Sequence, residues 1–160
     1  MKKSIIVCLF CFFIDRIIKL LVTSFISLGD SIKIIDKFFN ITYVTNDGAA
    51  FSIFSSKVPM LIIISIIALI FIVKYLIKNE LRSLEYIFYG LLIGGILGNL
   101  FDRIVYSSVI DYLDFNIFGY NFPIFNFADI CIVVSIGVIF IDMIRGEMIG
   151  NKSRWRDKIR

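Results

Sequence analysis

The stretch LEYIFYGLLIGGILGNLFDRIV, residues 84–105, decides the fold of this chain. It is long enough to cross a bilayer, because a transmembrane helix needs roughly 20 mostly apolar residues. Within it, Gly90, Gly94, Gly98 and Asp102 recur every four residues and therefore share one helix face. Small residues at this spacing let helix backbones approach closely in a membrane. We predict a spanning helix whose glycine face, continued by Asp102, packs against a neighbouring helix.

Three further apolar runs surround this stretch, at about 4–28, 58–77 and 125–144. The chain has 160 residues, of which 59% are hydrophobic, and its mean hydropathy is +0.90. A soluble domain is typically about 45–50% apolar, so this chain has more apolar surface than one small core can bury. We therefore predict an all-α membrane protein with four transmembrane helices, built as a single domain over residues 1–150.

Positive charges gather at one side of the predicted spans. They precede the first span, mark the junction between the second and third, and follow the fourth into a basic tail at 151–160, as Lys2, Lys3, Lys74, Lys78, Arg82 and Arg145 illustrate. Lysine and arginine favour cytoplasmic segments, so both termini are predicted to be cytoplasmic, and the loops at 29–57 and 106–124 face outward. We expect the tail to contact anionic membrane lipid, and we expect no nucleic-acid partner.

Residues 31–43, in the first outward loop, alternate loosely between apolar and polar side chains. Alternation with a period of two is typical of short β-strands. Asn46, Asp47 and Gly48 follow, a combination typical of a turn. We therefore predict a small β-containing extracytoplasmic cradle on the outer face of the four helices.

Charged residues inside two of the predicted spans need partners, because a charge in hydrocarbon is costly. Asp15 and Lys19 lie four residues apart, which places them on one helix face where they can pair. Asp102 and Arg103 are adjacent, and the structural role expected of them is to form an ion pair or an anchor at the membrane boundary. For both sets of residues, the sequence alone favours a structural role over a catalytic one.

Acid–base chemistry in this chain has to do without histidine, since the sequence contains none. Near neutral pH it falls to carboxylates, or to perturbed lysine, tyrosine or cysteine side chains. Asn126 precedes Asp129 by three residues, which is typical of a helix N-cap, and the helix dipole there favours a negative charge. Polar residues are dense at this outer boundary, and the candidate cluster comprises Asp111, Asp129, Asp102, Asn99, Asn126 and Asn46.

Two carboxyl groups held close together, such as Asp111 and Asp129, share one proton. The ionised member activates water and the protonated member donates to the leaving amine, so such a pair can hydrolyse a peptide bond without a metal or another cofactor. The cysteines Cys8, Cys11 and Cys131 lie in apolar runs and lack the companion ligands of a zinc site. A proton or ion pathway also uses membrane aspartates and stays open as an alternative.

Five segments of the chain resemble the signature segments of bacterial lipoprotein signal peptidase, also called signal peptidase II. They occur in the family's order and span residues 15 to 145. The segments are DRIIK at 15–19, NDGAAFS at 46–52, GGILGNLFDR at 94–103, VIDY at 109–112 and FNFAD at 125–129. Any one of these motifs is weak, but five in register on a matching four-span topology are highly specific.

The resemblance implies an aspartyl endopeptidase of the bacterial cytoplasmic (inner) membrane, with its active site on the outer face. It would cleave prolipoproteins just before the diacylglyceryl-modified cysteine, would need no cofactor, and would bind globomycin-type cyclic peptide inhibitors. By motif position, Asp111 and Asp129 form the catalytic pair. The residues that line or support the site are then Asn46, Gly48, Asn99, Asp102, Arg103, Asn126, Asp15 and Lys19.

The chain departs from the family's pattern at three places. Tyr112 follows Asp111 where phenylalanine is common, and Ile130 follows Asp129 where a small polar residue is frequent. Asp114 lies three residues after Asp111 and is a rival for the first carboxylate, although the VIDY context favours Asp111.

Two other functional classes compete with the peptidase. One is a small proton-coupled membrane transporter or channel subunit, which would need Asp102 or Asp15 for flux. The other is a non-catalytic membrane scaffold, in which neutral replacements of the aspartates would leave function intact. The turn around Asn46 and Gly48 favours the peptidase, since a transporter would not require it.

Overall fold

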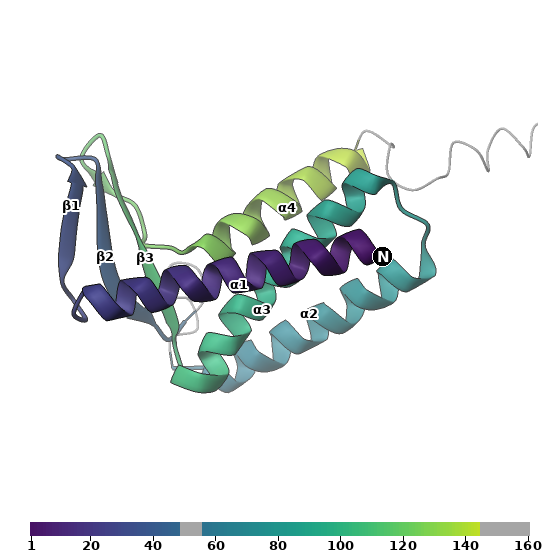
Figure 1. Cartoon of the computed structure of the whole chain (residues 1–160), viewed down its shortest axis with the longest axis horizontal. Helices are drawn as coiled ribbons and strands as arrows, with labels where there is room; N and C mark the ends of the chain where they lie inside the picture. The colour runs from purple at the N-terminus through teal and green to yellow at the C-terminus, as the bar shows by residue number, and fades with distance from the viewer. Residues whose placement is uncertain (49–55, 145–160) are drawn as a thin grey trace, which may run out of the picture.

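The computed structural model describes residues 1–48 and 56–144. Within these residues the chain forms four helices, namely α1 (Lys2–Phe25), α2 (Val58–Lys78), α3 (Ser83–Tyr106) and α4 (Phe127–Ile144). The helices run along the long axis of the molecule, and a sheet lies at the end where α1 and α3 end and α2 and α4 begin (Figure 1). The predicted basic tail at 151–160 and the AAFS part of one motif lie outside the described residues.

Three of these helices, α2, α3 and α4, are long and apolar enough to cross a membrane. Their bounds agree with the predicted runs at 58–77, 84–105 and 125–144 to within two residues. Helix α1 is as long as α3, but its apolar run is interrupted by Asp15, Arg16 and Lys19, all of which are buried. The first predicted run, 4–28, therefore forms a helix whose charges face the inside of the bundle.

Helix α3 is the central helix, and its glycines confirm the predicted close packing. A Cβ added at Gly90 would lie 2.6 Å from the carbonyl oxygen of Ser4 in α1, and one at Gly94 would also be too close to α1. On another face, a Cβ at Gly95 would lie 2.6 Å from the carbonyl oxygen of Ala128 in α4. Because real Cβ atoms do not approach so closely, α1 and α4 pack as tightly as they do only against glycine.

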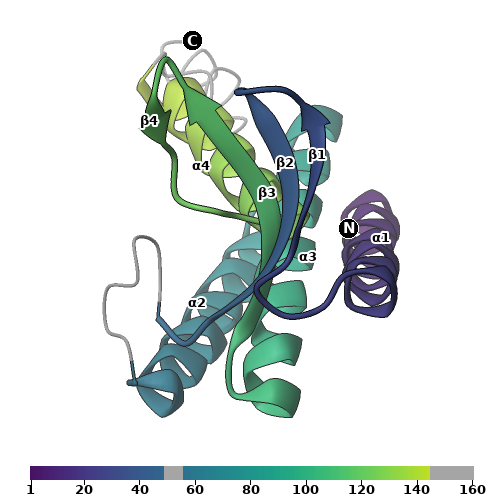
Figure 2. The ribbon, with the colours of Figure 1, turned by 90° about the vertical axis from the view of Figure 1, so that its left-hand side faces the viewer.

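The sheet contains four antiparallel strands in the order β1-β2-β3-β4, with bounds β1 (Ser31–Ile35), β2 (Phe39–Asn46), β3 (Val109–Ile117) and β4 (Tyr120–Asn121). Strands β1 and β2 confirm the strands predicted from the alternation at 31–43. Strands β3 and β4 lie in the second of the two loops that we predicted to face outward, 106–124, where we predicted no strand. Figure 2 views the sheet end, where β2 and β3 pass in front of α3 and α4, while α1 lies to one side.

Strand β3 also holds the segment that leads into α4. The ring of Phe115 stacks on Phe39 of β2 at 4.5 Å and on Phe125 at 5.7 Å between ring centroids. The backbone of Phe125 forms a bridge with Leu113, with N–O distances of 2.8 and 3.2 Å. These contacts bring the start of α4 beside β3, and so bring Asp129 near Asp111.

Candidate active site

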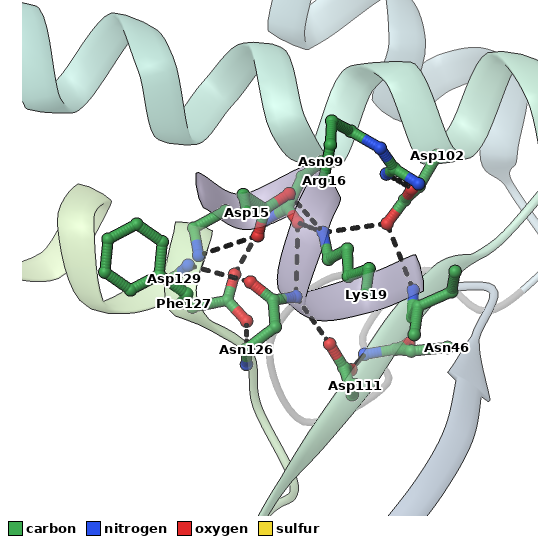
Figure 3. Close-up of polar contacts among 12 residues, drawn as sticks. Asp15, Arg16, Lys19, Asn46, Asn99, Asp102, Asp111, Asn126, Phe127 and Asp129 are labelled. Atoms are coloured by element: carbon green, nitrogen blue, oxygen red, sulfur yellow. Dashed lines mark hydrogen bonds and ion pairs between the residues drawn. The ribbon is translucent and has the colours of Figure 1, made fainter. Parts of the chain in front are cut away.

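The Asn126 side chain lies between the two carboxyl groups that the sequence singled out (Figure 3). Its Nδ2 donates to Asp111 Oδ1 at 2.6 Å and to Asn99 Oδ1 at 3.2 Å. Asn99 Nδ2 in turn donates to Asp129 Oδ1 at 2.7 Å. Two amide side chains thus connect Asp111 on β3 with Asp129 on α4, and the four residues form one hydrogen-bonded group.

Asp129 sits in the first turn of α4, as its spacing from Asn126 predicted. The Asp129 backbone N–H donates to Asn126 Oδ1 at 3.0 Å, which confirms the N-cap. The Asn126 backbone N–H donates back to Asp129 Oδ2 at 3.1 Å. This reciprocal pair is a capping box, and it fixes the rotamer of the Asp129 carboxyl group as well as the helix start.

Asp111 is buried on β3, with 3% of its surface exposed. Asn46 Nδ2 donates to its Oδ2 at 3.1 Å, from the neighbouring strand β2. Burial and, after it, the nearby Asp129 carboxylate raise the pKa of Asp111 to about 7, against the opposing effect of the hydrogen bonds from Asn126 and Asn46. Asp111 is therefore a carboxyl group that titrates near neutral pH.

Asn46 also orders the turn that follows β2. Its Oδ1 accepts the Gly48 backbone N–H at 2.9 Å, and Arg103 Nη2 donates to the Gly48 carbonyl oxygen at 3.0 Å. Arg103 thus reaches from α3 to the turn, and Asp102 faces α1. This differs from the ion pair between Asp102 and Arg103 that the sequence suggested.

Asp102 belongs instead to a buried ion-pair network with α1. Lys19 Nζ lies 2.8 Å from Asp102 Oδ2 and 2.9 Å from Asp15 Oδ2, and all three side chains have no exposed surface. Arg16 also pairs with Asp102. The predicted pairing of Asp15 with Lys19 is confirmed, and two acids balance two bases. Lys19 Nζ extends the network to the site by donating to Asn99 Oδ1 at 3.1 Å.

The same network fixes the two elements that carry the carboxyl pair. Asp15 Oδ1 accepts the Ala128 backbone N–H of α4 at 3.2 Å, and Asp102 Oδ2 accepts the Ile110 backbone N–H of β3 at 3.2 Å. Asp15 fits there because a Cβ at Gly98 would lie only 2.6 Å from its Oδ2. The glycine stripe therefore makes room for a carboxylate, and not only for a helix.

Asp114, the rival carboxylate, makes a different set of contacts. Its Oδ2 accepts from Thr42 Oγ1 at 2.7 Å and from Asn40 Nδ2 at 3.3 Å, both on β2. Side chains three apart on a strand point to opposite faces, so Asp114 points away from the side of β3 that presents Asp111. The geometry groups Asp111, and not Asp114, with Asp129.

A cavity of about 650 Å³ lies beside the carboxyl pair. Its polar lining includes the predicted site residues Asn46, Asn99, Arg103, Asp111 and Asp129, together with Thr45 and Asp47. Its apolar lining comes mostly from α4 and the segment before it, and includes Phe122, Phe125, Ile130, Val133 and Val134, with Val44 of β2 and Val109 of β3. Ile130 thus contributes apolar surface where the family's pattern suggests a polar group. In the described part of the chain, no cluster of three or more histidine, cysteine or acidic residues is arranged to hold a metal ion.

Sequence reasoning missed two polar contacts at the site. Arg16 pairs with Asp102, and its spacing of three from Lys19, which puts both on one helix face, was the available signal. Tyr112 accepts the Phe127 backbone N–H through its hydroxyl oxygen at 3.1 Å. The only signal for that contact was a tyrosine at a position where phenylalanine is usual.

Comparisons with known proteins agree with this geometry. The family model described as Signal peptidase (SPase) II matches residues 7–145. Proteins named lipoprotein signal peptidase from Staphylococcus aureus strains JH9 and Newman are each 39% identical over 143 residues, covering 89% of this chain and 88% of the relative.

Solved structures extend the likeness to the fold. A bacterial membrane enzyme determined by the in meso method at 2.3 Å resolution is 37% identical, with a TM-score of 0.86 over 95% of this chain and 92% of that chain. A second, at 1.9 Å, is 38% identical, with a TM-score of 0.80 over 89% of this chain and 93% of that chain. Sequence and fold agree along nearly the whole chain, which therefore belongs to the signal peptidase II family.

Proposed function

We propose that this chain removes signal peptides from prolipoproteins by cleaving just before the diacylglyceryl-modified cysteine. Membership of the signal peptidase II family and the names of the Staphylococcus aureus relatives support this substrate class. The observation that carries the proposal is the hydrogen-bonded group in which Asn126 and Asn99 join the carboxyl groups of Asp111 and Asp129 beside a cavity.

Asp111 and Asp129 would act as an aspartic-protease pair that shares one proton. The ionised carboxylate takes a proton from a water molecule, whose oxygen attacks the carbonyl carbon of the scissile peptide bond. The protonated carboxyl group stabilises the oxygen of the tetrahedral intermediate by a hydrogen bond. As the C–N bond breaks, a proton passes to the leaving amine. One proton remains on the pair at the end, as at the start.

The electrostatic surroundings of the two carboxyl groups support these two roles, one protonated and one ionised. Burial and the nearby Asp129 charge raise the pKa of Asp111 to about 7, so it can hold a proton where an ordinary aspartate is ionised. Asp129 accepts two N–H groups, from Asn99 and from the Asn126 backbone, at the positive end of α4. Because the two groups interact, the titration belongs to the pair and not to either residue alone.

The remaining predicted residues would support the pair rather than touch the reacting bond. Asn46 and Gly48 form the turn that flanks Asp111, and Arg103 holds that turn from α3. The carboxyl pair is supported from the buried side by the ion-pair network of Asp15, Lys19 and Asp102. Asn99 and Asn126 complete the link between the two carboxyl groups.

In the membrane, α1 would be a fourth spanning helix beside α2, α3 and α4. Its 24 residues are long enough, and its internal charges are paired inside the bundle. Both termini would be cytoplasmic and the sheet would form the outer cradle, in a single domain over 1–150 with a basic tail at 151–160. The apolar side of the cavity, formed by Val133 and Val134 of α4, would then lie toward the bilayer, where a lipid-modified substrate resides.

Globomycin-type cyclic peptides would inhibit by occupying the same cavity. The transporter or channel alternative is not supported, because the matching family and its curated relatives are peptidases. The scaffold alternative makes a distinct prediction, namely that neutral replacements of Asp111 and Asp129 leave function intact.

The proposed function is tested with the full chain purified in detergent micelles and two synthetic prolipoprotein peptides. The peptides differ only in whether the cysteine carries the diacylglyceryl group. We expect mass spectrometry to find cleavage directly before the cysteine of the modified peptide, with at least tenfold slower cleavage of the unmodified one. Cleavage at another bond, or no cleavage of either peptide, would contradict the proposal.

A further inference from the structure

Tyr112 joins the strand that carries one carboxyl group to the helix that carries the other. It is the residue after Asp111, and only 3% of its surface is exposed. Its hydroxyl oxygen accepts the backbone N–H of Phe127, the first residue of α4, at 3.1 Å. Its backbone N–H donates to the carbonyl oxygen of Phe125 at 3.0 Å. One residue thus holds both ends of the tripeptide that enters α4.

The first N–H groups of a helix have no partner within the helix and must find one elsewhere. In α4 these groups are taken by side chains of β3, of α1 and of the capping residue. Phe127 donates to Tyr112 of β3, Ala128 donates to Asp15 of α1, and Asp129 donates to the capping Asn126. Among these three backbone N–H contacts, the one with Tyr112 leads to the strand of Asp111.

The surroundings of Tyr112 keep its hydroxyl group in one place. The ring packs in an apolar cluster with Val22 of α1 and with Ile26, the residue that follows α1. Burial raises the pKa of the phenol, so the hydroxyl stays neutral and offers its oxygen to the Phe127 N–H. A buried ring with a single polar contact at its tip is a rigid spacer, since its few rotatable bonds are already fixed by packing.

We propose that Tyr112 is a positioning residue, whose hydroxyl sets the start of α4 against β3 and thereby the placement of the Asp129 carboxyl group relative to Asp111. This inference rests on the proposed function. Phenylalanine, the family's usual residue at this position, has no hydroxyl group and could not make this contact. Tyr112 acts through the start of α4 and does not touch the reacting bond.

The test compares Tyr112→Phe with Tyr43→Phe in the full chain. Both changes remove one hydroxyl group from the same apolar cluster, since Tyr43 packs against it as well. Cleavage of the diacylglyceryl-modified peptide is measured from pH 5 to 9. For Tyr112→Phe we expect kcat to fall roughly 3- to 10-fold with KM within twofold, and the alkaline limb to move to lower pH because the two carboxyl groups couple less. Tyr43→Phe should match the parent protein.

A second readout does not depend on activity. Hydrogen exchange followed by mass spectrometry should show faster exchange at residues 125–130 in Tyr112→Phe, because the Phe127 amide loses its acceptor, while exchange elsewhere in α4 is unchanged. Unchanged kcat, pH profile and exchange in Tyr112→Phe would overturn the positioning role while leaving the proposed function standing. If the parent protein does not cleave the peptide at all, the proposed function fails, and this inference fails with it.

Discussion

Asn126 shows how one side chain can serve two carboxyl groups. Its amide nitrogen donates to Asp111 and to Asn99, while its amide oxygen caps α4 by accepting the Asp129 N–H. An amide has both donors and an acceptor, so it can connect groups that a carboxylate or a lysine could not connect in the same way. This explains why a site built on two acids also needs asparagines around them.

Asp111 should make peptidase activity depend on pH. Its carboxyl group faces Asp129 of α4, Lys19 of α1 and Arg103 of α3, and its pKa is raised to about 7. The proton that the pair shares is therefore lost as the pH rises through about 7, and kcat should decline on the alkaline side with an apparent pKa near that value. A plot of kcat against pH measures this. A flat profile from pH 6 to 9 would contradict the assignment.

The same shift links Asp111 to stability. A carboxyl group whose pKa is raised by folding binds its proton more tightly in the folded state, so the folded protein loses stability as the pH rises from about 4 to about 7. Asp111→Asn should remove this part of the pH dependence, since its amide does not ionise. Melting temperatures of the two proteins across that range provide the comparison.

At the scale of single residues, the sequence predicted those contacts that depend on spacing along one element. The cap of Asp129 by Asn126 and the pair of Asp15 with Lys19 are of this kind, because helix geometry determines which side chains meet. The contact of Tyr112 with Phe127 joins two elements. Spacing carries no information about such a contact, so it appears only in three dimensions.

At the scale of elements, α3 has glycines at positions where neighbouring atoms come too close for a Cβ atom. Gly98 should not tolerate even a methyl group, because a Cβ there would lie 2.6 Å from Asp15 Oδ2. We expect Gly98→Ala to destabilise the protein by about 1–3 kcal/mol, as overpacking does in other tightly packed interiors.

Gly137 provides the matched control for this change, since a Cβ added there meets nothing within 4 Å. Thermal unfolding in detergent should show a lower melting temperature for Gly98→Ala and little change for Gly137→Ala. Equal melting temperatures for the two variants would mean that α1 and α3 are not packed as described.

Strands β3 and β4 were not predicted from the sequence, and β3 is the longer of the two. Its residues, VIDYLDFNI, carry apolar and polar side chains on both faces, so they lack the simple alternation that revealed β2. The mixture arises because one face presents Asp111 to the cavity while the other places Tyr112 in the core. Because each face of β3 carries both kinds of side chain, its sequence shows no simple alternation of apolar and polar residues.

At the scale of the whole molecule, the buried network around Lys19 joins α1 and α3 and reaches the starts of β3 and α4. Lys19→Met would leave the charges of Asp15 and Asp102 short of a partner. Breaking a buried ion pair in this way typically costs about 3–5 kcal/mol. We expect a large drop in melting temperature and loss of activity.

Lys33 offers the comparison for Lys19, because its pair with Asp36 is two-thirds exposed. Lys33→Met should change the melting temperature little, since exposed ion pairs contribute little to stability. A melting temperature of Lys19→Met close to that of Lys33→Met would show that the network does not hold the helices and the sheet together.

Hydropathy and the glycine stripe were enough to predict the helices and the close packing of the glycine face of α3 against a neighbouring helix, which the structure identifies as α1. They were not enough to show that the ion pairs of α1 lie beneath the carboxyl pair and reach it through Asn99. That arrangement depends on four segments that are distant in the chain. The predicted site residues that the structure brings together were nevertheless recognisable from motifs, since each motif is a short segment from one element or the turn beside it.

The central claim is that Asp111 and Asp129 act together on one peptide bond. The most direct measurement is the rate at which Asp111→Asn, Asp129→Asn and Asp114→Asn cleave the diacylglyceryl-modified peptide, with melting temperatures recorded for each. We predict that the first two lose at least a thousandfold in kcat while remaining folded, and that Asp114→Asn keeps activity close to that of the parent. Cleavage at the parent rate by either Asp111→Asn or Asp129→Asn would contradict the account.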